Sequence, residues 1–346
     1  MVSDSGSAQP QTPTGPTGTP TAPTPDRSVP VDPVPDNSAR TDPVPSDPVP
    51  SASARAAVAA GDAVAAGGAV AAGDAVGAGD ASSQLAYYRQ VSESSADGVL
   101  TASYQPTAVT EGAWASHEQH MAPASGLLAA VVERCSGRDD LITSRLSFDI
   151  LGVIHRRPFD VTARVVRPGR TIELVQAEMT SQGRTLVRVN AWRLVRSDTA
   201  DLAGDDFPAL PGPDEGGPWT GADYWGGGFI NSLELRTLPG WRPGRGRAWI
   251  RSDHPLIEGV AVSPLANLIR MTDSANGMAV RADPRELLFP NTDLTVHVFR
   301  EPSGEWLGLD VSVTFGPSGI GLTSSVLHDV DGPFGTAAQS LTLRRR

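Results

Sequence analysis

Lysine is absent from the 346-residue sequence, and all 28 basic residues are arginine. Chemistry that needs a side-chain amine is therefore excluded, which removes Schiff-base and pyridoxal enzymes, phosphate-loop proteins and Ser–Lys dyads. Cysteine occurs once, as Cys135, so an intrachain disulfide framework and a cysteine-based zinc site are excluded. No Gly-x-Ser-x-Gly sequence is present, which weighs against a serine hydrolase with a nucleophile elbow.

Long apolar runs are also lacking. No stretch of about 18 apolar residues is free of charge, and no basic N-terminal region precedes an apolar segment. We therefore expect no membrane span and a cytoplasmic location. The net charge of −11 argues against broad nucleic-acid binding, because such binding needs a basic surface.

The first 82 residues differ in composition from the rest of the chain. Thirteen of the 30 prolines lie in the first fifty residues, and residues 56–80 then repeat Ala, Gly and Val with a period of six. Such a stretch has too few apolar side chains to offset the entropy of chain ordering, and its glycines disfavour a helix. We predict that residues 1–82 form a disordered tail.

From residue 83 onward the pattern is that of packed strands and helices. Residues 83–197 predict a strand at 99–108, a helix beginning near Pro123, and four strands at 144–151, 159–167, 171–181 and 184–196. The predicted helix carries an apolar stripe that runs from Leu128 to Cys135. This segment is predicted to be the first domain.

The same order of elements recurs after a Pro- and Gly-rich linker at 198–228. Residues 229–346 predict strands at 229–238 and 248–253, a helix capped by Ser263 with Pro264 in its first turn, and four strands at 292–300, 306–315, 319–328 and 334–345. A sheet with one apolar face must be covered, and each half supplies one helix to cover it. We predict an α+β protein with two helix-on-sheet units that arose by internal duplication.

Several short segments occur in an order that points to a known family. They are residues 291–298 (NTDLTVHV), 304–310 (GEWLGLD), 319–322 (GIGL) and 335–341 (GTAAQSL), with Gln119-His120 and residues 165–170 (VVRPGR) in the first half. In these segments the chain resembles the acyl-CoA thioesterase II-like superfamily over about residues 84–346. The resemblance implies a double hotdog fold, in which two antiparallel sheets each wrap a long helix.

The resemblance also implies hydrolysis of acyl-CoA thioesters by water without a covalent enzyme intermediate, and we expect no cofactor. In the family, an Asp at the start of the strand after the second helix, a hydroxyl residue and a C-terminal Gln arrange that water. Asp293 and Gln339 match the first and last positions, and Thr314 and Ser318 are the hydroxyls offered for the middle one. A carboxylate can accept the water proton, while a carboxamide can fix the orientation of the water.

Three further residues are candidates for substrate binding: His120, Asp273 and Asn276. Asn276 and Gly277 can both be explained as the C-terminal cap of the second helix. Asp273 opposes the helix dipole, so a role in lining the site is a better explanation for it.

His117 and His120 are three residues apart without a clear third ligand, whereas the zinc-protease pattern needs a spacing of four, so we predict no metal site. His120 is instead expected to order a loop or line a pocket. Backbone N–H groups at the helix starts near Pro123 and Pro264 are the candidates for stabilising an oxyanion.

An internal comparison indicates one hydrolytic site per chain. Aligning the two halves by their turns places Arg145 opposite Asp293 and Asn190 opposite Gln339. The first half therefore lacks a carboxylate at the matching position.

Two other function classes stay open. A non-catalytic acyl-thioester or lipid-binding module would keep the fold and bind without turnover. A hotdog dehydratase or hydratase would need an Asp/His pair, and the sequence does not place His297 or His328 beside Asp293. The acyl chain length also stays open, as does pairing of sheet edges between two copies into a homo-oligomer.

Overall fold

The computed structural model describes residues 85–221 and 224–346, and strands are its most common regular element. The predicted tail, residues 1–82, lies outside these residues. The described strands form one antiparallel sheet of 13 strands and a two-stranded sheet. The smaller sheet pairs β10 (Leu287–Leu288) with β15 (Arg344–Arg345).

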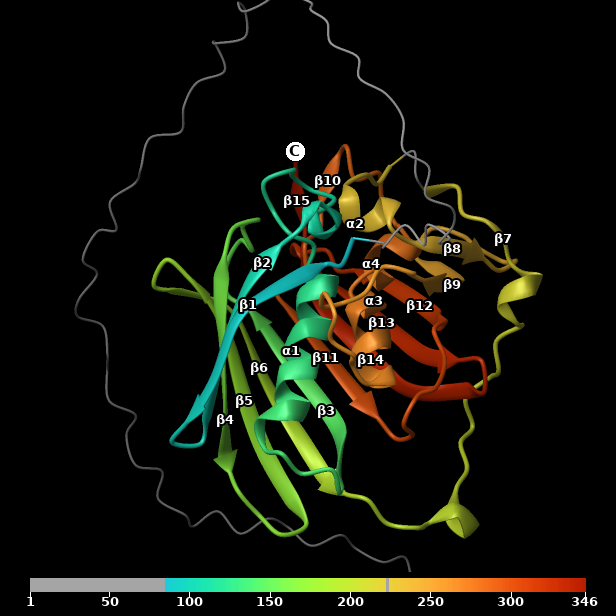
Figure 1. The fold of residues 1–346 in the computed structure, drawn as a ribbon. Helices are drawn as coiled ribbons and strands as arrows, with labels where there is room; N and C mark the ends of the chain where they lie inside the picture. The colour runs from blue at the N-terminus through green and yellow to red at the C-terminus, as the bar shows by residue number, and fades with distance from the viewer. Residues whose placement is uncertain (1–84, 222–223) are drawn as a thin grey trace, which may run out of the picture. The chain divides into compact units, whose positions relative to one another are not determined.

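The first half contributes six strands and one long helix, which Figure 1 shows in blue to green. They are β1 (Tyr88–Ala96), β2 (Val99–Pro106), α1 (Met121–Cys135), β3 (Leu141–Ile150), β4 (Phe159–Arg167), β5 (Ile172–Ser181) and β6 (Arg184–Val195). The four strands after the helix agree with the prediction to within three residues at each end. The helix begins two residues before Pro123, because His120 is its N-cap and accepts a hydrogen bond from the N–H of Ala122.

The second half repeats this order with shorter helices. Its elements are β7 (Gly217–Pro218), α2 (Gly228–Asn231), β8 (Glu234–Thr237), β9 (Arg245–Arg251), α3 (Pro264–Thr272), α4 (Ala275–Met278), β11 (Asp293–Val298), β12 (Leu307–Phe315), β13 (Ile320–Asp329) and β14 (Gly332–Thr342). Ser263 and Pro264 begin α3 as predicted, and Ser263 Oγ accepts from the N–H of Ala266. The strand predicted at 229–238 is wrong in its first part, where the chain forms α2.

The strand order is the same when it is read inward from either edge. It runs β1-β2-β4-β5-β6-β3 in the first half and β7-β8-β9-β12-β13-β14-β11 in the second, with only β7 added. In the middle β3 pairs with β11, and Ser147 lies opposite Thr295. The sheet is therefore continuous through this pair, and its backbone hydrogen bonds satisfy what would otherwise be two exposed sheet edges.

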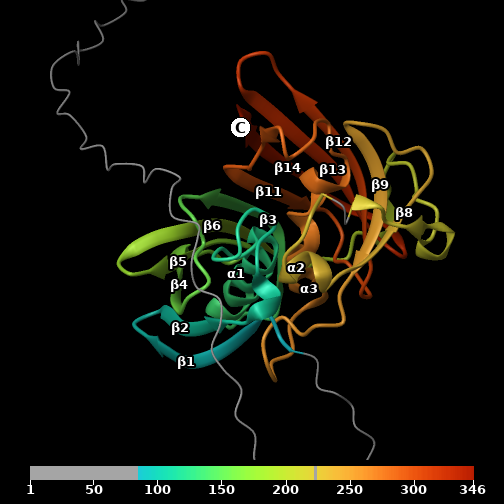
Figure 2. The same ribbon diagram turned by 90° about the horizontal axis from the view of Figure 1, so that it is seen from above.

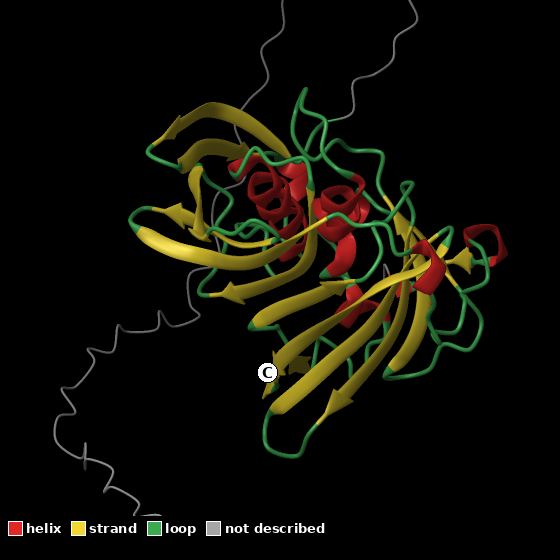
Figure 3. Cartoon of the chain, turned by 90° about the horizontal axis from the view of Figure 1, so that it is seen from below, coloured by secondary structure: helices red, strands yellow, loops and turns green. Residues whose placement is uncertain are grey.

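Helices α1 and α3 lie side by side on the inner face of the sheet (Figures 2 and 3). All twelve residues from Met121 to Val132 are buried, so α1 is apolar around its whole circumference and the predicted stripe is only part of its buried surface. Helix α3 is only nine residues long, contrary to the prediction of a second long helix. Ser125 links the helices by donating from Oγ to the carbonyl oxygen of Ile269 at 3.0 Å.

Gly126 allows the two helices to approach closely. A Cβ atom at this position would lie 2.4 Å from Cβ of Arg270 and 2.8 Å from the carbonyl oxygen of Ala266. We expect Gly126→Ala to destabilise the fold by about 1–3 kcal/mol, although alanine is the better helix former by about 1 kcal/mol. Chemical denaturation measures the difference.

Gly204→Ala is the matched control, because an added Cβ there meets nothing within 4 Å. Equal stability of the two variants would mean that α1 and α3 separate without cost.

Candidate active site

Helix α3 ends at a buried carboxylate. Asp273 is the C-cap residue of the helix and is 4% exposed. A negative charge at this end of a helix is not stabilised by the dipole, so other side chains must hold it. The predicted cap by Asn276 and Gly277 is not formed, because both residues lie inside α4.

Two carboxamides bind Asp273. Gln339 donates from Nε2 to Asp273 Oδ1 at 2.8 Å, and Asn291 donates from Nδ2 to the same oxygen at 2.7 Å. Gln339 lies in β14, where it shares the inner face with Ala337 and Leu341 and is 1% exposed. The fold thus joins a helix end to a strand residue 66 positions later.

The second carboxylate oxygen faces a histidine. Asp273 Oδ2 lies 3.6 Å from Nδ1 of His120, and this nitrogen accepts a hydrogen bond from the N–H of Ala122 at 3.1 Å. Because Nδ1 is an acceptor there, we assign the ring proton to Nε2. The ring of Phe229 packs on the imidazole, with a centroid distance of 4.4 Å.

Burial changes the protonation of both groups. It raises the pKa of Asp273 to about 7, although the hydrogen bonds from Asn291 and Gln339 act in the opposite direction. Burial also lowers the pKa of His120 to about 4, so the imidazole is neutral near pH 7 and its contact with Asp273 is not an ion pair. A carboxyl group with a pKa near neutrality can accept a proton and return it within one reaction cycle.

A pocket of ≈ 200 Å³ reaches these groups. Its walls come from the loop before α1, the loop after β3 and the segment before β11. Its polar lining includes all three residues predicted to bind substrate and the carboxamide that the prediction lacked: His120, Asp273, Asn276 and Asn291. Their convergence is a property of the fold, and their roles stay predictions.

The N-terminus of α1 lies at the same pocket, which Met121 also lines. Backbone N–H groups in the first turn of a helix have no partner within the helix and can donate to a ligand. The N-terminus of α3 is at the other end of the helix pair, where Ser263 donates from Oγ to Glu133 Oε2 at 2.6 Å. Of the two helix starts considered, the start of α1 is the one beside Asp273.

Asp293, Thr314 and Ser318 are not brought to Gln339. Asp293 lies on the outer side of β11, where Oδ1 accepts from the backbone N–H of Ser340 at 2.6 Å. Side chains alternate across a strand, and Leu294 takes the inward position next to it. Thr314 is exposed near the end of β12, and Ser318 is exposed in the following turn.

Sequence reasoning missed Thr323 as well as Asn291. Thr323 pairs with Gln339 across β13 and β14 and is 1% exposed. Its Oγ1 and the Oε1 of Gln339 are both buried without a hydrogen-bond partner, which is costly unless a water or ligand group bonds to them. Alternation in β13, with Thr323 two positions from Ser325 and four from Leu327, was the signal for an inward hydroxyl.

The internal comparison was wrong by one residue in β6. Asn190 lies between the buried Val189 and Ala191, and its Oδ1 accepts from Nε2 of Gln176. It therefore faces the opposite side of the sheet from the position that Gln339 occupies in β14. The other half of the comparison, Arg145 opposite Asp293, concerns a position outside the candidate site, so the prediction of one hydrolytic site per chain stays a prediction.

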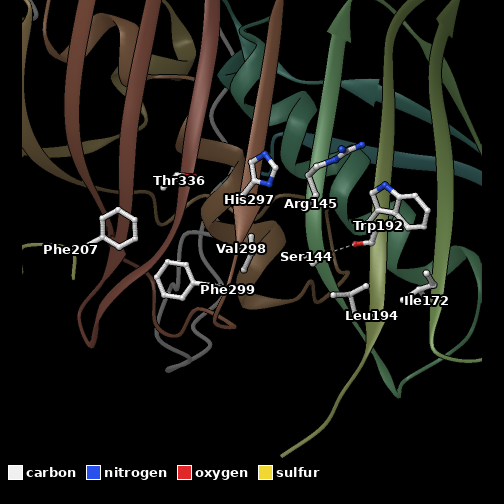
Figure 4. Close-up of a pocket in the computed structure, with 10 residues that line it drawn as sticks. All are labelled: Ser144, Arg145, Ile172, Trp192, Leu194, Phe207, His297, Val298, Phe299 and Thr336. Carbon is white, nitrogen blue, oxygen red and sulfur yellow. Dashed lines mark hydrogen bonds between the residues drawn. The ribbon is translucent and has the colours of Figure 1, made fainter. Parts of the chain in front are cut away.

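A larger hollow, of ≈ 610 Å³, lies on the outer face near the junction of β3 and β11. Figure 4 shows Arg145 and His297 side by side there, with Trp192, Phe207 and Phe299 around them. None of the residues around Asp273 lines it. The sheet separates this hollow from the candidate site.

Neither a metal-binding cluster nor a membrane-spanning helix occurs in the described part of the chain. Residues 85–221 and 224–346 contain no group of three or more His, Cys, Asp or Glu side chains arranged to hold a metal ion. Within the same ranges, none of the helices has the length and apolar character needed to cross a bilayer.

Both halves of the chain match the families of one enzyme class. Residues 110–194 match the acyl-CoA thioesterase N-terminal domain, and residues 205–343 match the acyl-CoA thioesterase C-terminal domain. No curated protein matches the sequence.

Solved structures show the fold. A hot dog fold protein of unknown function from Alicyclobacillus acidocaldarius is 13% identical with a TM-score of 0.59, over 73% of this chain and 96% of that one. The tesB protein of Mycobacterium avium subs paratuberculosis is 14% identical with a TM-score of 0.54, over 73% of this chain and 96% of that one. The acyl-CoA thioesterase II TesB2 of Mycobacterium marinum is 16% identical with a TM-score of 0.53, over 72% of this chain and 92% of that one. The fold of this chain is therefore a hotdog fold, with a large antiparallel sheet and few helices.

Proposed function

We propose, given that the chain belongs to the acyl-CoA thioesterase family, that it hydrolyses acyl-CoA thioesters at Asp273 and Gln339. The observation that carries this assignment is the contact of Asp273 with Gln339 and Asn291 in a pocket beside the start of α1. In this proposal Asp273 takes the role of base that the sequence predicted for Asp293.

The reaction uses the free oxygen of Asp273. Ionised Asp273 takes a proton from water at Oδ2 while Oδ1 stays bound to the two carboxamides. The resulting hydroxide attacks the thioester carbonyl carbon and gives a tetrahedral intermediate. The C–S bond then breaks, the carboxylic acid forms, and protonated Asp273 returns its proton to the departing coenzyme A thiolate.

Two further parts of the site assist these steps. Backbone N–H groups in the first turn of α1 stabilise the oxyanion, which is typically worth about 3–4 kcal/mol per donor in such sites. Thr323 supplies the hydroxyl that Thr314 and Ser318 were expected to supply, because its Oγ1 lies inside the sheet next to Gln339. Asn291 and Gln339 fix Asp273 so that Oδ2 faces the pocket.

Release of free thiol from acyl-CoA tests this function directly. Acyl-CoAs of different chain lengths are incubated with the full-length protein, and the release of free coenzyme A is followed with a thiol reagent. Turnover no faster than in buffer, together with tight acyl-CoA binding, would instead identify a non-catalytic acyl-thioester binding module.

The reaction should depend on pH in one direction. Because burial raises the pKa of Asp273 to about 7 and the carboxylate is the active form, kcat/KM should rise through about pH 7 and level off above it. Measurement of kcat/KM between about pH 5 and about pH 9 checks this. A flat profile would show that no group titrating near neutrality governs the reaction.

Hydration of an enoyl-CoA is a second candidate, favoured by the contact of Asp273 with His120. The sequence did not place any histidine beside a candidate aspartate, and His120 supplies the missing partner. The two reactions are distinguished by their products, since hydration removes the enoyl absorbance and releases no thiol.

We also interpret the two halves, 83–197 and 229–346, as fused hotdog units joined by the linker at 198–228. The shared strand order supports this interpretation, as does the presence of one central helix in each half. Under this interpretation the 13-stranded sheet consists of two hotdog sheets that meet at β3 and β11.

A further inference from the structure

Another cavity lies along residues 277–283. It has a volume of ≈ 440 Å³. Three of the seven tryptophans of the chain line it together with one tyrosine: Trp219, Trp225, Trp241 and Tyr224. Such a concentration of aromatic side chains around one cavity indicates a binding site for a flat, weakly polar group.

The cavity adjoins the candidate active site through shared walls. Trp225, Gly277 and Met278 line it and also line a small cavity that reaches His120 and Asn276. His120 and Asn276 in turn line the pocket that contains Asp273. The connecting cavity has a volume of only ≈ 20 Å³, so a ligand that contacts both places must run over residues 276–278 at this constriction.

The aromatic side chains differ in exposure in a way that suits a stacked ligand. Tyr224 is 49% exposed and Trp241 is 48% exposed, so both side chains are accessible to a ligand over part of their surface. The ring of Trp241 is held by donation from Nε1 to the carbonyl oxygen of Met278 at 3.0 Å. Trp225 is 7% exposed, and its indole N–H is buried without a partner, so it can donate to an acceptor atom of a ligand.

Two arginines lie near this cavity, one in its lining and one over the ring of Tyr224. Arg281 lines it and is exposed, and its Nε is held by the carbonyl oxygen of Val313 at 2.8 Å. The guanidinium of Arg285 lies over the ring of Tyr224 at 5.3 Å and pairs with Asp283, so it is partly neutralised. The cavity thus combines an aromatic lining with the exposed Arg281, while the Asp283 in its lining is paired with Arg285. This combination complements a purine base that carries phosphate groups, whereas an acyl chain would use neither Arg281 nor the indole N–H.

We propose that this cavity binds the adenine and phosphate end of the coenzyme A thioester. The assignment rests on the proposed function, because the acyl thioester must lie at Asp273 while the nucleotide occupies the aromatic cavity. The adenine ring stacks with Tyr224 and Trp241, a ring nitrogen accepts from the indole N–H of Trp225, and the phosphates face Arg281.

Truncated substrates test the assignment. Tyr224→Ala and Trp241→Ala are compared with the parent on an acyl-CoA and on the matching S-acyl-pantetheine, which lacks the nucleotide. Loss of one stacking contact should raise KM for acyl-CoA by about 5- to 150-fold with kcat little changed, and should leave kcat/KM for S-acyl-pantetheine unaltered. Phe299→Ala is the matched control, because Phe299 is an exposed ring on the other hollow.

Equal losses on both substrates would overturn the proposal and assign the cavity to the acyl group or to scaffold stability. No loss on either substrate would also overturn it. Titration with adenosine 3′,5′-bisphosphate, followed by tryptophan fluorescence, tests the nucleotide site without turnover: binding to the parent that is lost in Tyr224→Ala supports the site. Binding without hydrolysis would reject the proposed function alone, and hydrolysis without such binding would reject this site alone.

Discussion

Replacement of Asp273 by asparagine is expected to lower kcat for acyl-CoA hydrolysis by about 10²–10⁴-fold. The substitution keeps the shape of the side chain and an oxygen that can accept from Gln339 and Asn291, so the buried network persists. It removes the group that accepts the water proton. Steady-state release of free thiol gives the rate, and circular dichroism shows that the variant is folded.

Asp293→Asn is the matched control for this experiment. Asp293 lies on the outer side of β11 and accepts from the N–H of Ser340, out of reach of the pocket. We expect its kcat to stay within a factor of about three of the parent, because the change removes one exposed hydrogen bond worth about 1 kcal/mol to the fold. A large loss in Asp293→Asn with normal activity in Asp273→Asn would restore the base predicted from the sequence.

Stability gives an independent readout of the same carboxyl group. The pKa of Asp273 is raised from 3.8 in the unfolded chain to about 7 in the fold, so the folded state binds the proton more tightly between these values. The parent should therefore lose stability as the pH rises from about 4 to about 7, by on the order of 4 kcal/mol, and Asp273→Asn should lack this loss. A purely catalytic effect of the substitution would leave the two stability profiles parallel.

The sequence contained more information about the site than the prediction used. Gln339 alternates with Ala337 and Leu341 in β14, which places it on the inner face, whereas Asp293 precedes the inward Leu294. Period-two alternation therefore separates the two side chains onto opposite faces of the sheet. Alternation cannot predict which residue Gln339 contacts, because Asp273 reaches Gln339 only through the packing of α3 on the sheet.

The errors in predicting the fold have the same cause, because a local sequence pattern does not reveal which distant segments pair. Strand β1 has mostly exposed residues, so no alternation reveals it, although Asp97-Gly98 forms its turn to β2 with φ of 52° and 74°. The pairing of β3 with β11 joins residues about 148 positions apart, as for Ser147 and Thr295, and no local pattern predicts such a pair. Elements with a strong period, such as β4, were predicted at their observed bounds.

The second large effect that we expect is a loss of folding stability when the guanidinium of Arg193 is removed. A buried ion pair lies in the first half, near the C-terminal end of α1. Arg193 and Glu173 are each 3% exposed, with N–O at 3.3 Å, and Arg193 also donates to the carbonyl oxygens of Arg138 and Leu141. Arg193→Ala would leave the Glu173 charge buried and unpaired, which typically costs about 3–5 kcal/mol.

The double variant Arg193→Met/Glu173→Met separates charge from packing. Replacing a buried ion pair by apolar side chains of similar volume is often neutral or stabilising, so this variant should recover most of the lost stability. Denaturant unfolding measures both variants, and thiol release by the folded fraction should match the parent, because Arg193 lies near Ser136 at the C-terminal end of α1, away from His120 at its start. If Arg193→Ala instead unfolded no more easily than the parent, the ion pair would contribute nothing to the first half, and its burial there would need another explanation.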